Sequence, residues 1–163
     1  MKKTEKRLLE MLENNARISL EEAAVMLGEQ EDNVAAAMKS LEDQGIVCGY
    51  NTMIDWDRTG IDKVTALIEV SVTPQRDKGF DDIAERIFQY PEVDTAYLIS
   101  GDYDLMLILE GKSLKQVAEF VANKLSVEDE VLNTKTHFIL KRYKDHGTVM
   151  ERKHKDKRDK VTA

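Results

Sequence analysis

The chain has 163 residues, of which 42% are hydrophobic and 34% are charged, a composition typical of a folded globular protein rather than a disordered or membrane-embedded one. The length suffices for one ordinary domain or two small ones. No apolar run is long enough to span a bilayer, and the N-terminus MKKTEKRLLEML lacks the apolar core of a signal peptide. We therefore expect a cytoplasmic protein with no membrane partner.

The charge is distributed unevenly along the chain. The net charge is −7, whereas a simple nucleic-acid binder is usually basic. Residues 1–57 carry six cations against twelve acids, and the remaining residues carry 18 against 19. Cys48 is the only cysteine and the three histidines are scattered, so the sequence offers no disulfide framework and no metal-ligand spacing. We expect no metal and no cofactor, and we expect Cys48 to be a small buried hydrophobe.

Two short helices are predicted at the start of the chain. The first covers residues 6–12, where leucines recur on one face. Asn14 and Asn15 then interrupt the pattern. Ser19, followed three residues later by Glu22, is typical of a capping box that opens the second helix, LEEAAVML.

A third helix is predicted over residues 31–44, close behind the second. Val34, Met38 and Leu41 recur at spacings of four and three, which indicates one core-facing side. Gly45 follows as a C-terminal capping glycine. Three helices with a tight second turn are typical of a helix-turn-helix.

A strand or wing and then a hinge are predicted after the third helix. The stretch IVCGYNTMID alternates as a strand does, and WDRTG is rich in turn-forming residues. We therefore predict a winged helix-turn-helix DNA-binding domain over residues 1–50 and a strand and hinge linker over 51–62.

After Gly60 the hydrophobic period changes from helical to two. Strands are predicted at KVTALIEVSVTP, VDTAYLIS, LMLILEG and VLNTKTHFILKRY, and amphipathic helices at FDDIAERIFQYP and SLKQVAEFVANKL. The order β-α-β-β-α-β predicts a ferredoxin-like domain over residues 63–145, with two helices on one face of a four-stranded antiparallel sheet. The whole chain is thus expected to be α+β.

The second face of this sheet is predicted to be apolar as well, because LMLILEG is apolar on both sides. The chain has no further element to cover it, so we expect a second copy to do so. Residues 146–163 are locally basic without an apolar period and are predicted to be an unstructured tail. The alternative for this tail is a loose attraction to phosphate.

Three stretches together resemble the Lrp/AsnC family of leucine-responsive and asparagine regulators. They are NNARISLEEAAVMLG, LEDQGIVCGYNTMIDWDRTG and LISGDYDLMLILEG, in this order. The resemblance implies a DNA-binding transcription regulator that is not an enzyme. It also implies dimers that assemble further, possibly to an octamer, with an amino acid or related effector bound between subunits at the GDYD loop.

The residues at this loop are of the types that an amino-acid effector needs. Carboxylates accept from an ammonium group, and hydroxyl and backbone N–H groups donate to a carboxylate. Threonines on the last strand are expected to reach the loop of a neighbouring subunit. The candidate effector residues are Ser100, Gly101, Asp102, Tyr103, Asp104, Thr134 and Thr136. The alternative is that GDYD is only a tight hairpin turn.

The third helix is poor in residues that read DNA. The resemblance implies an arginine near the position of Ala37, whereas this chain has the run AAAMKS. The candidate DNA-binding residues are Arg17, Gln30, Asn33, Ala36, Ala37, Lys39 and Ser40. We expect binding to double-stranded DNA that is weak per subunit, dependent on oligomers, sensitive to salt and poorly selective.

Two alternatives to a DNA-binding regulator remain open. The first is a ligand-sensing or assembly protein of the same fold whose DNA binding is weak or lost. The second is an enzyme, because some tetrapyrrole-processing decarboxylases resemble this architecture. The enzyme is disfavoured because no converging set of histidines or arginines is apparent in the second domain.

Overall fold

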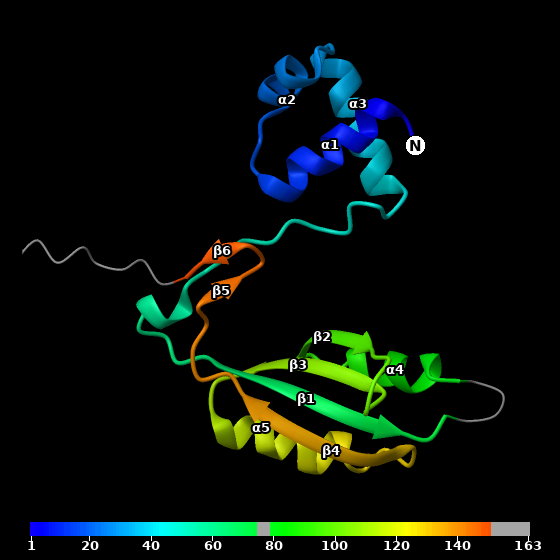
Figure 1. Ribbon diagram of the computed structural model, residues 1–163, viewed down its shortest axis with the longest axis vertical. Helices are drawn as coiled ribbons and strands as arrows, with labels where there is room; N and C mark the ends of the chain where they lie inside the picture. Colours follow the sequence, from blue (N-terminus) through cyan, green and yellow to red (C-terminus); the bar gives the residue numbers. More distant parts are fainter. Residues whose placement is uncertain (75–78, 151–163) are drawn as a thin grey trace, which may run out of the picture. The chain divides into compact units, whose positions relative to one another are not determined.

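The computed structural model describes residues 1–74 and 79–150, which fall into two compact units (Figure 1). The first unit spans Met1–Met53 and the second Ile54–Ala163. The first is helical and the second contains a four-stranded sheet with helices, so the fold is α+β as predicted.

The first unit consists of three helices around a small core. They are α1 (Lys3–Asn14), α2 (Leu20–Leu27) and α3 (Glu31–Asp43). The predicted capping box is present, because the backbone N–H of Glu22 donates to Ser19 Oγ over 3.1 Å and Glu22 Oε2 accepts from the Ser19 N–H. The apolar faces of the helices meet in one buried cluster of Leu8, Leu12, Ala23, Ala24, Val34 and Leu41. The helix-turn-helix predicted from the period of three and four is therefore confirmed.

The strand or wing predicted after α3 is not formed. Residues 46–55 contain no strand, and the only regular structure between α3 and residue 64 is a short 3₁₀ turn, η1 (Trp56–Arg58). A strand needs a partner for its backbone N–H and C=O groups, and none of the described residues pairs with this stretch. The prediction that Cys48 is buried is also wrong. Its thiol is exposed and lies 3.1 Å from the carbonyl oxygen of Gly45.

The sheet of the second unit has the predicted ferredoxin-like topology. Its strands are β1 (Val64–Val72), β2 (Val93–Leu98), β3 (Leu105–Gly111) and β4 (Val131–Phe138). They are antiparallel in the order β2-β3-β1-β4, so β1 and β3 are central. The split order follows because each helical connection passes over one strand position: the connection from β1 to β2 passes over the position of β3, and that from β3 to β4 passes over β1.

Helices α4 (Asp81–Phe88) and α5 (Leu114–Phe120) cover one face of the sheet. The last turn of the predicted fifth helix is a π-helical turn, η2 (Val121–Leu125), which keeps Leu125 in the core. Alternate residues of the central strands point to these helices. The buried cluster comprises Ile68, Val70, Val72, Ile83, Ile87, Leu105, Leu107, Leu109, Phe120 and Leu125.

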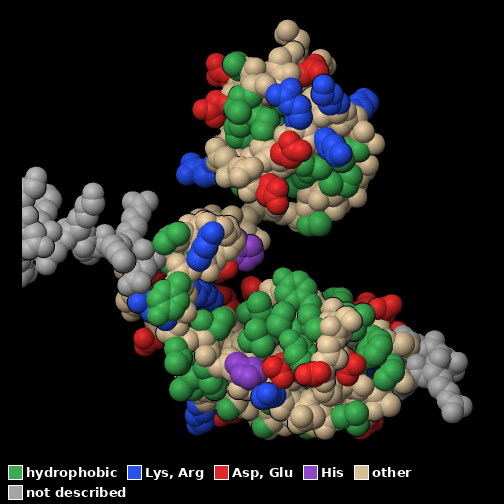
Figure 2. All heavy atoms as spheres, viewed as in Figure 1, with side chains coloured by type: hydrophobic (Ala, Val, Ile, Leu, Met, Phe, Trp, Pro, Cys, Tyr) green, Lys and Arg blue, Asp and Glu red, His purple; other side chains and the backbone are tan. Residues whose placement is uncertain are grey.

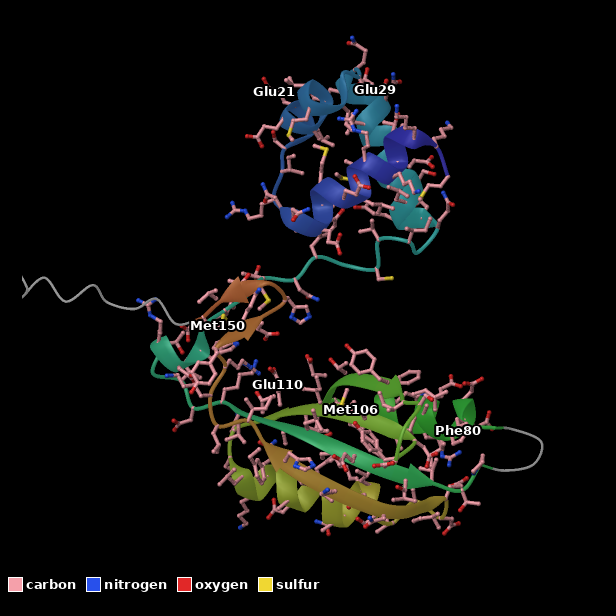
Figure 3. All side chains as sticks on the ribbon, in the orientation of Figure 1. Glu21, Glu29, Phe80, Met106, Glu110 and Met150 are labelled. Carbon is pink, nitrogen blue, oxygen red and sulfur yellow. The ribbon has the colours of Figure 1, made fainter. Side chains whose placement is uncertain are left out.

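The opposite face of the sheet is apolar only over β1, β2 and β3. Its half-buried or exposed side chains include Leu67, Tyr97, Met106 and Ile108, which alternate with the core residues. In Figure 3, Met106 and Glu110 mark two positions on this side of β3, and Figure 2 shows hydrophobic side chains gathered on the visible face of the second unit. We call this surface the open face.

Polar and charged residues occupy the open face where β1 pairs with β4. Glu69 Oε1 lies 3.0 Å from His137 Nε2, and Glu69 Oε2 lies 3.8 Å from Lys135 Nζ. An apolar surface was predicted for this side of the sheet, and the structure shows that it does not extend over β4.

A short hairpin follows β4 and was not predicted. It consists of β5 (Lys144–Asp145) and β6 (Thr148–Val149). The two turn residues, His146 and Gly147, both have positive φ, at 40° and 79°, which matches the two-residue turn that suits the twist of paired strands. Residues 146–149 therefore belong to a hairpin and not to an unstructured tail. The rest of the predicted tail, from residue 151, lies outside the described residues.

Candidate functional site

One face of α3 lines a groove of about 530 Å³ in the first unit. The residues of α3 in this groove lie at positions i, i+3, i+4 and i+7, which is one side of a helix. They are Asn33, Ala36, Ala37 and Ser40. The opposite wall comes from the start of α1 and from Glu29, in the turn before α3, which Figure 3 labels. We call this surface the α3 groove.

The charges of α3 serve the helix itself. Glu31 and Asp32 occupy its first turn, where negative charge is favourable because the helix dipole is positive there. Lys39 is its only cation, and its Nζ lies 3.0 Å from Asp43 Oδ1, with both side chains exposed. A phosphate that approaches Lys39 therefore also approaches Asp43.

The structure brings four of the seven predicted DNA-binding residues together in the α3 groove, namely Asn33, Ala36, Ala37 and Ser40. Arg17, Gln30 and Lys39 do not line it. Gln30 precedes α3 as its N-cap, without a side-chain hydrogen bond to the helix.

The sequence did not identify the second wall of the groove. Thr4 Oγ1 donates to Glu29 Oε1 over 3.2 Å, and the backbone N–H of Lys2 donates to Glu5 Oε2 over 2.6 Å. Thr4 and Glu5 were missed because α1 begins at Lys3, one turn earlier than its leucines indicate. Glu5, three residues after Lys2, was the available signal for this start.

Two further hydrogen bonds join parts of the first unit, one at α3 and one between α1 and α2. Tyr50 Oη donates to Glu42 Oε1 over 2.7 Å, and this hydrogen bond to a carboxylate raises the pKa of Tyr50. Arg7 Nη2 donates to the Met26 carbonyl oxygen over 3.0 Å, at the end of α2. Arg7 thus supports the packing of α1 on α2.

In the second unit, the GDYD loop is the connection between β2 and β3. The Ile99 N–H donates to the Asp104 carbonyl oxygen over 2.7 Å, which closes the hairpin. Asp104 Oδ2 accepts from the backbone N–H of Val72 over 2.8 Å, and the Asp104 N–H donates to the Val70 carbonyl oxygen over 3.1 Å. Asp104 therefore fastens the loop to the end of β1.

The rest of the loop is more open. Ser100, Gly101 and Asp102 are exposed, and Tyr103 is half-buried with its Oη 3.7 Å from Met106 Sδ. The backbone therefore forms the hairpin turn of the alternative interpretation. Ser100, Gly101 and Asp102 nevertheless remain accessible to a ligand.

The two threonines predicted for the effector site lie apart from this loop. Thr134 pairs with Val70 and Thr136 with Ile68, so both share the side of the sheet that the helices cover. Strand β1 separates them from β3 and its loop. Within one subunit the structure does not bring Thr134 or Thr136 together with residues 100–104.

Comparison with known proteins agrees with this division. The family model of the Lrp/AsnC ligand binding domain matches residues 65–149, and that of the winged helix-turn-helix DNA-binding domain matches residues 1–47. The chain is 47% identical over 161 residues to the transcriptional regulator YugG of Bacillus subtilis, covering 97% of each chain. It is 31% identical over 140 residues to the regulator LrpA of Pyrococcus abyssi, covering 86% of this chain and 96% of that one.

A solved structure is similar over the same length. The transcriptional regulator of Neisseria meningitidis in complex with L-methionine superposes with a TM-score of 0.70 at 25% identity, covering 89% of this chain and 93% of that one. A helix-turn-helix domain followed by an Lrp/AsnC ligand binding domain is the organisation of a DNA-binding transcription regulator. The chain belongs to the Lrp/AsnC family. Across residues 1–74 and 79–150, no helix is both long and apolar enough to cross a bilayer.

The role of Asp104 can be separated from that of Asp102 by substitution. We expect Asp104→Ala to lower the free energy of unfolding by about 1–3 kcal/mol, because it leaves the Val72 N–H without its acceptor. Asp102→Ala, at an exposed position two residues away, is the matched control and should change it by less than about 0.5 kcal/mol. Urea unfolding at one fixed protein concentration measures both. Equal effects would contradict the fastening role of Asp104.

Proposed function

We propose that this regulator acts in the cytoplasm as an assembly of several subunits, each of which binds DNA weakly, and that it responds to an amino acid bound at the loop of residues 100–104 between subunits. The observation that carries the proposal is the accessible loop beside the sheet face that α4 and α5 leave uncovered.

Weak binding by each helix-turn-helix is supported by the charges of the first unit. Affinity for DNA depends on the number of phosphates that lysine and arginine neutralise. The α3 groove has Lys2 as its only basic lining residue, with Glu5 and Glu29 beside it. Lys39 is paired with Asp43. Several such units held together raise the effective concentration at the DNA, which compensates for weak single contacts.

Association of subunits is supported by the open face. Leu67, Met106 and Ile108 lie at its centre on the two central strands, and Tyr97, with 49% of its surface exposed, flanks them. Exposed apolar surface of this kind is typical of an interface. Polar and charged groups border this patch, with Glu69, Lys135 and His137 along β4 and Glu110 near Lys63 and Arg142 at the end of β3. A second copy is a suitable occupant because it presents the same apolar patch, so that the two patches can cover each other.

An amino-acid effector is supported by the polar groups of the loop. Asp102 can accept from an ammonium group, and the Ser100 hydroxyl with the backbone N–H groups around Gly101 can donate to a carboxylate. Asp104 holds the loop in place and is already bonded to Val72. The Neisseria meningitidis regulator was solved with L-methionine, which is a ligand of this chemical class.

A second candidate function is a ligand-sensing or assembly protein of the same family that no longer binds DNA with useful affinity. The specific observation in its favour is the α3 groove, whose two carboxylates outnumber its one lysine.

Pairing through the open face can be tested with Ile108→Asp. We expect a carboxylate at the centre of the patch to shift the protein towards single subunits and to weaken its DNA binding in parallel. Val127→Asp, at an exposed apolar residue in the loop after η2, is the matched control and should change neither. Analytical ultracentrifugation and mobility-shift titration measure the two properties. A dissociated Ile108→Asp protein that still binds DNA as tightly as the parent would refute the dependence on assembly.

The effector can be identified by footprinting the protein on its own upstream DNA with each common amino acid in turn. We expect one or a few of them to change the footprint and to raise the melting temperature, since a ligand at 100 times its Kd stabilises by about 2.7 kcal/mol. The double variant Ser100→Ala, Asp102→Asn should lose the response and keep the ligand-free footprint. If the double variant responds as the parent does, the effector binds elsewhere.

Lys39 and Lys115 form a matched pair for testing phosphate contact. Both are exposed and both make an i,i+4 ion pair, Lys39 with Asp43 and Lys115 with Glu119. Lys39→Ala should weaken DNA binding and reduce the slope of log K against log salt by about 0.9, the value for one phosphate. Lys115→Ala should leave both unchanged. If the two variants behave alike in filter-binding titrations, Lys39 does not contact DNA.

A further inference from the structure

The floor of the α3 groove has no charged side chain. Asn33, Ala36, Ala37 and Ser40 form it, and the charged residues Lys2, Glu5 and Glu29 belong to the opposite wall. Asn33 and Ala36 are exposed, whereas Ala37 is half-buried against the core of the first unit. The longest side chain on the floor is thus an asparagine, so that base edges can approach α3 closely.

This set of side chains favours some base pairs over others in the major groove. Guanine is usually read by arginine or lysine at its O6 and N7 atoms, and the floor contains neither. Adenine is read by asparagine at N6 and N7, and the thymine methyl group is read by apolar contact with a residue such as alanine. Ser40 is compatible with any base, and its Oγ already accepts from Gln44 Nε2 over 2.8 Å.

The spacing along the helix suits neighbouring base pairs. Helix residues three apart have Cβ atoms about 5–6 Å apart, while successive base pairs are separated by about 3.4 Å along each strand. Asn33 and Ala36 can therefore contact adjacent or next-but-one pairs on one side of the groove.

We propose that α3 selects A·T pairs, with Asn33 bonded to an adenine and Ala36 against the methyl group of a nearby thymine. This inference rests on the proposed DNA binding and adds to it which base pairs α3 prefers. It is compatible with poor overall selectivity, because only two residues discriminate. A G·C pair opposite Ala36 would place the guanine O6 or the cytosine N4 against a methyl group, which offers neither a hydrogen-bond partner nor a thymine methyl contact. A G·C pair opposite Asn33 would lose the paired N6 and N7 contacts that adenine makes with an asparagine amide.

Selection from a randomised duplex library with the full chain tests the preference. We expect the bound duplexes to be enriched in a short A·T run that contains an adenine at one fixed position. Binding without base preference, or enrichment of G·C pairs through a carboxylate such as Glu29, would overturn this inference and leave the proposed DNA binding intact. If no duplex is bound, both fail.

The methyl contact can be tested on the DNA side, which leaves the protein unchanged. In a selected duplex, replacing the thymine by deoxyuridine removes only the methyl group. We expect a loss of affinity of about fourfold, the factor for one buried CH₂-sized group. If every duplex with a thymine replaced by deoxyuridine binds as tightly as the selected duplex, Ala36 does not contact a thymine methyl group.

Two substitutions test the protein side. Asn33→Ala should reduce discrimination for the fixed adenine by a factor on the order of ten to a hundred. Asn51→Ala, in the linker outside the groove, is the control and should retain the discrimination for this adenine. Ala36→Arg should create a preference for guanine at the thymine position. If Asn33→Ala retains the adenine and Ala36→Arg, folded by circular dichroism, selects the parent sequence, the assignment of both residues is wrong.

Discussion

The fold of the second unit and the proposed assembly both depend on the two apolar sides of the central strands β1 and β3. Their inward residues, such as Ile68 and Leu107, are fully buried under α4 and α5 and hold the second unit together. Their outward residues, such as Leu67 and Ile108, are half-buried and lie on the face opposite α4 and α5. A buried face stabilises one subunit, whereas an uncovered one favours association, so the same alternation supports both the fold and the proposed assembly.

The elements that the sequence predicted correctly are those whose core contacts repeat locally. Val34 and Leu41 on α3, and Ile83 and Ile87 on α4, recur at helical spacing and are buried as expected. The stretch of residues 46–55 failed because an alternating pattern describes the side chains of a strand but not the partner that its backbone needs. Cys48 was misplaced with it, because its neighbour Val47 packs against the core of the first unit while the Cys48 thiol is exposed.

The candidate sites were predictable only in part, for a related reason. The loop of residues 100–104 was found from its turn residues, but the bond between Asp104 and Val72 joins positions 32 residues apart. The direction of Thr134 depends on the register between β4 and β1, and a shift of one residue would turn it to the other face. Neither relation has a local signature in the sequence.

The residues of α3 that stabilise the helix are also residues that contribute little affinity for DNA. Its alanines have the highest intrinsic helix propensity, and its first-turn acids complement the helix dipole. The same choices remove the long basic side chains that give one subunit a high affinity. In the proposed assembly, several such subunits held together compensate for this, because each raises the effective concentration of the others at the DNA. A ligand that changes the assembly would therefore change DNA occupancy more steeply than one acting on a single tight binding site.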